Sequence, residues 1–117
     1  MTLKLDKISN SSDLDKERIV ISVLQDDDVG QYAMLRSYVN NDAPTAGDQE
    51  AFWFPDQKVK TGDLVVLYSK DGTTSTKALK NGATVYFFYW GKSNPMWRER
   101  TYVPILLDIR EWQVLGV

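Results

Sequence analysis

The stretch TVYFFYWGKSNPMW, residues 84–97, decides how this chain can fold. Five aromatic side chains stand in an unbroken row from Tyr86 to Trp90, immediately before Gly91. Successive side chains of a strand point to opposite faces, so Phe88 and its even-numbered neighbours share one face, and Phe87 and its odd-numbered neighbours share the other. A strand of this kind is either central and buried on both faces, or it holds an aromatic surface out for a ligand.

The composition predicts one ordinary globular domain. The chain has 117 residues, of which 43% are hydrophobic and 26% are charged. A chain of this length buries roughly two-thirds of the surface that its unfolded form exposes, so a single core can be stable without disulfides. There is no cysteine, which favours a reducing compartment.

The absence of histidine and cysteine narrows the possible chemistry. It excludes the catalytic triads that use them, the zinc sites built from them and the commonest general base near neutral pH. For a glycosidase, two carboxylates must face each other across a cleft, and the sequence pairs no two of them. We therefore expect a protein that is not an enzyme and has no cofactor.

Period-2 runs bounded by turn residues recur along the chain, which indicates an all-β domain of about eight short strands. The expected strands are 3–8, 18–24, 31–39, 51–54, 63–69, 84–90, 102–108 and 111–115. Asp71-Gly72 and Asn81-Gly82 suit chain reversals, because these residues tolerate positive φ. The polar run 73–80 between them is read as a long loop or a flap.

Two of these strands have further features. The segment 29–39 also fits helical spacing, and a strand is preferred there over a helix. Pro104 lacks a backbone donor, so its strand is expected at a sheet edge or at a bulge. Eight short strands in one domain leave a sandwich or a barrel as the stable arrangements.

The amino-terminal segment predicts a lead-in rather than a targeting signal. Residues 1–17 alternate polar and apolar side chains and lack the continuous apolar segment of a secretory signal. No run approaches the roughly 20 apolar residues of a membrane span. We expect 1–17 to be a partly flexible lead-in to a domain at 18–117, in a soluble protein that is cytoplasmic by default.

Charge is unevenly distributed along the chain. Residues 11–50 carry nine acids and three bases, whereas residues 51–117 carry six acids and nine bases. Neither part has the dense basic stripe of a nucleic-acid binder, and the pI near 5.0 also argues against one. No nucleic-acid partner is expected.

The chain resembles the lamin-tail domain family, in particular its bacterial lamin-tail-like members. The resemblance covers roughly residues 18–115. It is carried by AFWFPDQKVKTGDLVVLYSKDG (51–72), FFYWG (87–91) with Trp97 beyond it, ILLD (105–108) and EWQV (111–114). The matching positions are Phe54-Pro55, Gly62, Val65-Val66-Leu67 and, in a closing hairpin, Leu106-Leu107-Asp108.

This resemblance implies an immunoglobulin-like β-sandwich without catalytic residues. The family is known as a non-catalytic module, often attached to hydrolases or membrane anchors. The chain departs from the family's pattern at 40–54, where many members carry an Asn-rich turn, and at Ile109-Arg110, where the closing hairpin has no glycine. The implied function is that of a binding or interaction module, with a protein as the partner and the oligomeric state open.

Four residues are the candidates for partner binding: Trp97, Arg98, Arg100 and Tyr89. Trp97 follows Gly91 and Pro95 in a loop beside two arginines, and loops on a rigid scaffold carry binding residues. Trp and Arg are also enriched in binding hot spots. In one interpretation these aromatic side chains form an exposed platform for a peptide or a sugar ring. In the other they belong to the core, with Trp97 capping the end of the sandwich.

Two further hypotheses follow from the residue types. A carbohydrate-binding domain that uses exposed Trp and Tyr side chains is the alternative function. Asp26, Asp27 and Asp28 precede Gly30 and offer oxygen ligands of the kind that calcium prefers. Their spacing is not that of an EF-hand loop, and adjacent acids commonly lie on a solvated turn, so no metal site is expected.

Overall fold

The structure is a computed structural model that describes residues 1–45, 50–98 and 101–116. In these ranges the chain is all-β, with eleven strands, a short 3-10 turn at Val29–Gln31 and no α-helix. The strands are β1 (Leu3–Ser9), β2 (Arg18–Val23), β3 (Asp27–Asp28), β4 (Tyr32–Asn40), β5 (Ala43–Pro44), β6 (Glu50–Trp53), β7 (Lys58–Val59), β8 (Leu64–Tyr68), β9 (Ser75–Ala78), β10 (Thr84–Tyr89) and β11 (Tyr102–Asp108).

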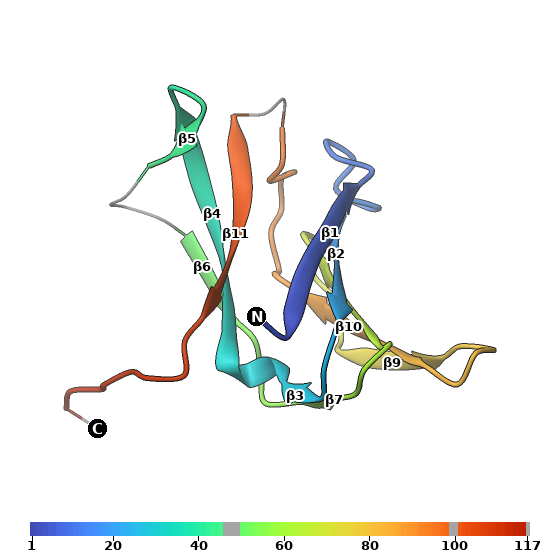
Figure 1. Ribbon diagram of the computed structural model, residues 1–117. Coiled ribbons are helices and arrows are strands. Elements are labelled where there is room, and N and C mark those ends of the chain that lie inside the picture. Colours follow the sequence, from blue (N-terminus) through green and yellow to red (C-terminus); the bar gives the residue numbers. More distant parts are fainter. Residues whose placement is uncertain (46–49, 99–100, 117) are drawn as a thin grey trace.

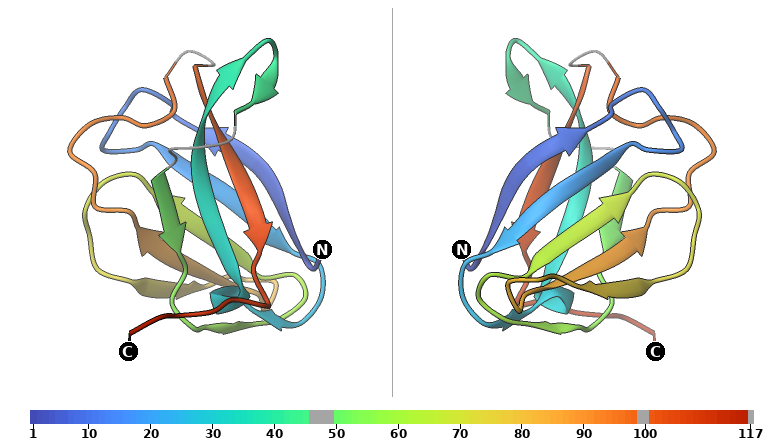
Figure 2. Two further views of the ribbon diagram at one scale, coloured as in Figure 1. Left: turned by 90° about the vertical axis from the view of Figure 1, so that its left-hand side faces the viewer. Right: turned by 90° about the vertical axis from the view of Figure 1, so that its right-hand side faces the viewer.

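Two larger sheets face each other, an arrangement compatible with a β-sandwich (Figures 1 and 2). The five-stranded sheet has the order β1-β2-β8-β10-β9. In the second sheet, β4 pairs with β11 along one side and with β6 and β5 along the other. The short strands β3 and β7 pair with each other where the two sheets approach, at the lower end of the molecule in Figure 1.

The aromatic strand β10 lies inside the five-stranded sheet, between β8 and β9. It runs antiparallel to β9 and parallel to β8, with Phe87 opposite Val66 and Phe88 opposite Leu67. The parallel pair arises because the chain leaves β8, forms β9 on the far side and returns through the turn at Gly82 into β10. Strand pairing therefore satisfies the backbone of β10 on both sides, as expected for a central strand.

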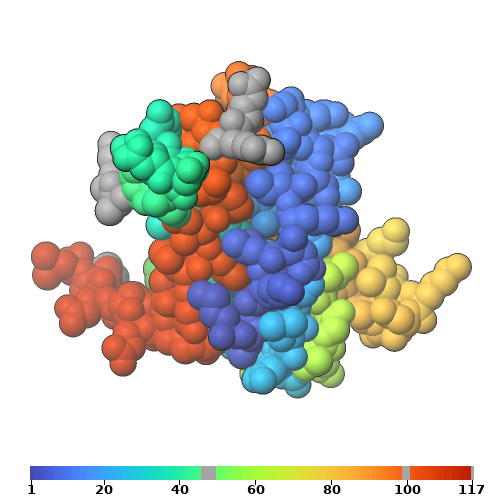
Figure 3. Space-filling view, turned by 45° about the horizontal axis from the view of Figure 1, so that its top comes forward, coloured from blue at the N-terminus to red at the C-terminus, as the bar shows by residue number. Residues whose placement is uncertain are grey.

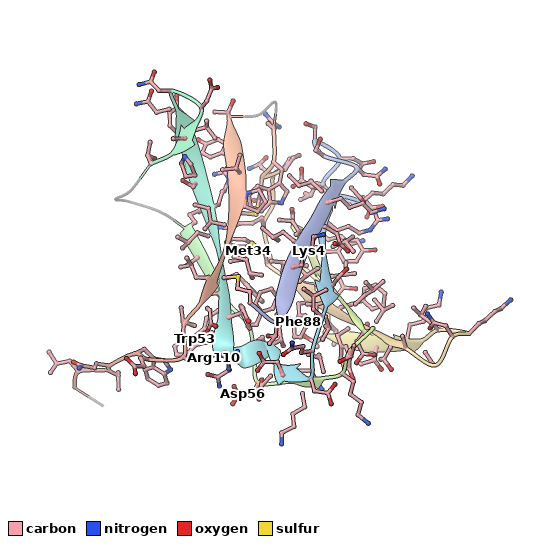
Figure 4. All side chains as sticks on the ribbon, viewed as in Figure 1. Lys4, Met34, Trp53, Asp56, Phe88 and Arg110 are labelled. Carbon is pink, nitrogen blue, oxygen red and sulfur yellow. The ribbon has the colours of Figure 1, made fainter. Side chains whose placement is uncertain are left out.

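The core lies between the two sheets. Met34 from β4 and Phe88 from β10 point into this space from opposite sides (Figure 4). The Phe88 ring contacts Phe54 edge to face, with 5.4 Å between ring centroids. Full burial of such side chains is the main stabilising contribution to a domain of this size.

Seven of the eight expected strands are present as β1, β2, β4, β6, β8, β10 and β11. Of the segment 29–39, the part from Tyr32 onward forms a strand and not an α-helix, and Val29–Gln31 forms the 3-10 turn before it. Pro104 lies in β11, which pairs only with β4 in the described ranges, so the edge position predicted for it is confirmed. The prediction of an eighth strand at 111–115 is wrong, because no residue of 109–116 pairs with a described strand. The short strands β3, β5 and β7 were not predicted, and β9 occupies the run interpreted as a loop.

The segment 1–17 is an integral part of the fold and not a lead-in to it. β1 pairs antiparallel with β2 at the edge of the five-stranded sheet, and Leu3 is buried in the core. Glu17 is also fully buried. The fold therefore begins near residue 3 and not at residue 18.

Candidate functional site

Trp97 is buried, with only 3% of its surface exposed, so the expectation of an exposed loop residue is wrong. Its ring lies inside the core and contacts Trp90 edge to face, with 6.1 Å between centroids. The loop that follows β10 thus turns back between the sheets and inserts Met96 and Trp97 into their common core. The burial of Trp97 agrees with the interpretation in which the aromatic side chains belong to the core.

Glu17 holds this loop in place. Its carboxylate accepts hydrogen bonds from the backbone N–H of Met96 at 2.7 Å and of Trp97 at 3.4 Å. It also accepts from the Ser69 hydroxyl at 2.5 Å and from the Ser12 N–H at 2.8 Å. A buried carboxylate is costly unless it is satisfied, and here four donors from three separate segments converge on one side chain. The sequence does not mark Glu17 as a buried residue, because glutamate is rarely buried and its neighbours are polar.

The four candidate residues do not form one surface in the part of the chain that the structure describes. Trp97 faces inward, whereas Tyr89 lies half-buried on the outer side of the five-stranded sheet, opposite the core. Arg98 is exposed, and Arg100 lies outside the described residues. Only Tyr89 belongs to an aromatic surface, and that surface has other members.

We call this outer side of the five-stranded sheet the aromatic face. Its apolar members are Val20, Leu64, Val66, Tyr68, Val85, Phe87 and Tyr89, of which Val66 and Val85 are buried and the others are partly exposed. Basic side chains on the same side are Lys4, Lys7, Arg18 and Lys77, with Lys70 just beyond Tyr68. No described segment covers this face as a second layer (Figures 1 and 2). On the second apolar face of the strand 84–90, Phe87 and Tyr89 are therefore partly exposed, whereas Val85 is buried.

The tyrosines of the aromatic face are ordered by contacts within the chain. The Tyr68 and Tyr89 rings are stacked, with centroids 5.3 Å apart and an interplanar angle of 9°. The Arg18 guanidinium and the Lys70 ammonium lie over Tyr68, at 5.8 Å and 5.1 Å from its centroid. Gly72 lies against Tyr89, where an added Cβ would come within 2.4 Å of the ring. Such cation–π contacts favour a rigid surface that combines aromatic and positive groups.

The three adjacent aspartates have three different sets of partners. Asp26 accepts from the backbone and hydroxyl of Thr61, and Asp28 accepts from the N–H groups of Gly30 and Gln57. Asp27 accepts from Arg110 and Thr2. In the described ranges, no group of three or more acidic side chains is arranged to hold a metal ion. The aspartates instead join the 26–28 segment to three other parts of the chain.

The contact between Asp27 and Arg110 is the main electrostatic feature of this region. Burial alone would raise the pKa of Asp27, but hydrogen bonds from Arg110, Thr2 and the Asp28 N–H together lower it to about 2. Arg110 also donates to Asp108 at 3.0 Å, and its hydrogen bonds to these two carboxylates raise its own pKa. Arg110 thus forms a fork between Asp108 at the end of β11 and Asp27 in β3.

Two tryptophans are exposed, and neither is among the four residues expected to bind a partner. Trp53 on β6 and Trp112 contact each other edge to face, with 4.9 Å between centroids and an angle of 81°. They are 50% and 59% exposed. Trp53 lies in the expected strand 51–54 and Trp112 in the expected strand 111–115, and neither pattern distinguishes an exposed tryptophan from a buried one.

Comparisons with known proteins assign no family to the chain. A scan against protein families finds no match, and a search of the curated proteins finds none either. The described residues contain no helix that is long and apolar enough to cross a membrane.

Proposed function

We propose that this protein is a non-catalytic interaction module of the lamin-tail type, with an immunoglobulin-like sandwich, and that its aromatic face binds a protein partner. The observation that carries the proposal is the aromatic outer surface around β10. An uncovered apolar surface with a polar rim is typical of interaction sites. Tyr and Arg, both present here, are enriched in binding hot spots.

The charge of the aromatic face suggests the chemistry of the partner. Lys4, Lys7, Arg18 and Lys77 point to the same side, although the chain as a whole has a net charge of −2. The acidic side chains nearby are engaged, since Asp6 accepts from Ser22 and Asp15 pairs with Lys70 at 3.3 Å. An extended segment that alternates acidic and apolar side chains would complement this surface in both charge and hydrophobicity.

The carbohydrate-binding alternative has less support. It depends on exposed aromatic rings that a sugar can stack on, but Trp97 is buried. Trp53 and Trp112 stand nearly perpendicular to each other, and Tyr68 and Tyr89 stack on one another. These pairs do not form a coplanar exposed row.

The experiment is a titration followed by backbone amide shifts, with a synthetic peptide of alternating Glu and Leu and, separately, with neutral oligosaccharides. We expect the peptide to shift amides of β8 and β10 and to bind more weakly at higher salt. Lys77→Glu, on an exposed edge strand, should weaken binding by about threefold or more, as expected for one exposed ion pair. Lys58→Glu on β7 is the matched control and should bind like the wild type.

Two outcomes would contradict this proposal. One is the absence of peptide-induced shifts on β8 and β10. The other is a response of these amides to oligosaccharides only, which would favour the carbohydrate-binding alternative.

A further inference from the structure

The outer side of the second sheet carries an uncharged apolar surface, which we call the neutral face. The inward side chains of its strands include Met34, Phe52 and Leu106. By alternation and register, the outward side chains on the three strands are Ala33, Leu35, Ser37, Val39, Ala51, Trp53, Val103, Ile105 and Leu107, of which Ala33 and Ser37 are buried. None of these side chains is charged. Leu35, Val103, Ile105 and Leu107 are only partly buried.

The segment 109–116 leaves β11 beside the neutral face. Its start is held by the Ile109 N–H, which donates to the Gln31 carbonyl at 2.8 Å, and by the Arg110 fork. Beyond Trp112 it projects away from the body of the molecule (Figures 1 and 3). Val114 is 62% and Leu115 98% exposed. The segment has the alternating pattern of a strand, yet it has no partner strand in the described chain.

We propose that two copies of this chain associate through the neutral face together with the segment 109–116, so that the segment of each copy packs on the other. A strand-like segment with exposed apolar side chains and unpaired backbone groups is a template for pairing with another chain. In a two-fold symmetric dimer the same surface serves both partners. In such a dimer, the unpaired segment of each copy therefore packs on the neutral face of the other copy.

Charge favours a second copy as the occupant of this face. Two neutral faces can meet without bringing like charges together, which would oppose self-association. The aromatic face, with its several lysines and arginine, would repel its own copy. The two outer faces of the molecule are thus suited to different partners.

The area of contact explains why the segment is needed. Three strands about 4.8 Å apart and about 23 Å long form a surface of roughly 300 Å². A stable interface needs about 800 Å² from each partner. Trp112, which is 59% exposed, can add roughly 150 Å². Val114, Leu115 and the extended main chain add to this, so the face and the segment together approach the required size.

Sedimentation velocity of the full chain tests the proposal. Because self-association follows mass action, the average sedimentation coefficient of the wild type should rise between about 1 and 300 μM. Leu115→Asp should weaken the association about tenfold or more, since it places a charge in an apolar contact. It cannot disturb the monomer, because Leu115 is almost fully exposed. Leu24→Asp, after β2 in the other sheet, removes a 48% exposed leucine and is the matched control.

A wild type that stays monomeric over this range would overturn the proposal. So would an association that survives Leu115→Asp or is lost in Leu24→Asp. The location of the contact is measured separately by mixing isotope-labelled wild type with unlabelled Gln113→Cys carrying a spin label. The chain has no other cysteine, so the label is unique. Amides of Leu35, Ile105 and Leu107 should broaden, and broadening confined to β8 and β10 would contradict the neutral face as the interface.

Discussion

Glu17 differs from every other acidic side chain that the structure describes, because it is fully buried and its partners are neutral donors. Its four hydrogen bonds join the segment before β2, the end of β8 and the loop after β10. Together with the Arg36 guanidinium, which donates to the Met96 carbonyl at 3.0 Å, this carboxylate holds the loop that carries Trp97. The sequence position of Glu17, in a polar run before the first long apolar strand, shows nothing of this role.

Glu17→Gln should lower the free energy of unfolding by about 1–3 kcal/mol, because the amide nitrogen cannot accept a hydrogen bond and leaves buried N–H groups unsatisfied. The measurement is a pair of denaturant midpoints. Asp15→Asn removes a charge from a side chain that is 82% exposed, and should change stability by about 0.5 kcal/mol or less. If Glu17→Gln were as stable as Asp15→Asn, the carboxylate would not hold the loop.

The pair of Asp27 and Arg110 predicts a specific pH dependence. The folded pKa of Asp27, about 2, lies below its ordinary value of 3.8. A group with a lowered pKa stabilises the fold above its ordinary pKa, and this stabilisation is lost as the pH falls through the folded pKa. Arg110→Gln should therefore be less stable than the wild type near pH 7, and the difference should shrink as the pH falls from about 4 to 2.

Denaturation midpoints from pH 7 to pH 2 check this prediction. Arg98→Gln is the control, since Arg98 is exposed and outside this cluster. It should show no comparable convergence with the wild type. A constant difference between Arg110→Gln and the wild type across the range would mean that Asp27 does not titrate as described.

The loop after β10 behaves as a core element although it has no regular secondary structure. Trp97→Ala should cost about 3–5 kcal/mol of stability, as should Phe88→Ala, because both remove a large buried side chain. Trp112→Ala should cost about 1 kcal/mol or less, since its ring is mostly exposed. Chemical denaturation of the three variants gives the comparison. If the Trp97→Ala variant were as stable as Trp112→Ala, the core position of Trp97 would be contradicted.

Among the strands, the sequence identified those with a strong period-2 pattern and missed those with few residues. β3, β5 and β7 have two residues each, too few to show any period. β9 is exposed throughout and polar, so only its pairing with β10 makes it a strand. The run 111–115 differs from β9 in the opposite sense. Its sequence has the alternating pattern of a strand, but it pairs with no described strand.

The two ends of the whole molecule differ in what they contribute to the fold. β1 buries Leu3 and pairs with β2, whereas the segment after Arg110 touches the body mainly through Trp112 and Trp53. A chain that starts at residue 10 should melt at least about 10 °C lower, since a loss of several kcal/mol shifts the melting temperature by that much in a domain of this size. A chain that stops at Arg110 should melt within a few degrees of the full chain. Thermal melts followed by circular dichroism measure both, and equal melting temperatures for the two truncations would contradict this assignment.

The sequence by itself determined that the chain is all-β, that the strand 84–90 is apolar on both faces, and that Pro104 lies at an edge or at a bulge. These features depend on local alternation and backbone chemistry, which each segment carries within itself. It also excluded the chemistry of histidine and cysteine, because composition alone decides which groups exist. The lamin-tail resemblance and the role of an interaction module remain proposals.

Only the tertiary structure decided which aromatic side chains are buried. Trp97 follows Gly91 and Pro95 in a polar loop, yet its ring packs on Trp90 in the core and its N–H donates to a carboxylate 80 positions earlier in the chain. The parallel pairing of β8 and β10, the Arg110 fork and the two outer faces likewise arise from contacts between distant segments. A local pattern states which way a side chain points within its own strand. Which other segment covers each face of that strand depends on how all the strands pack, and the sequence of one segment does not contain that information.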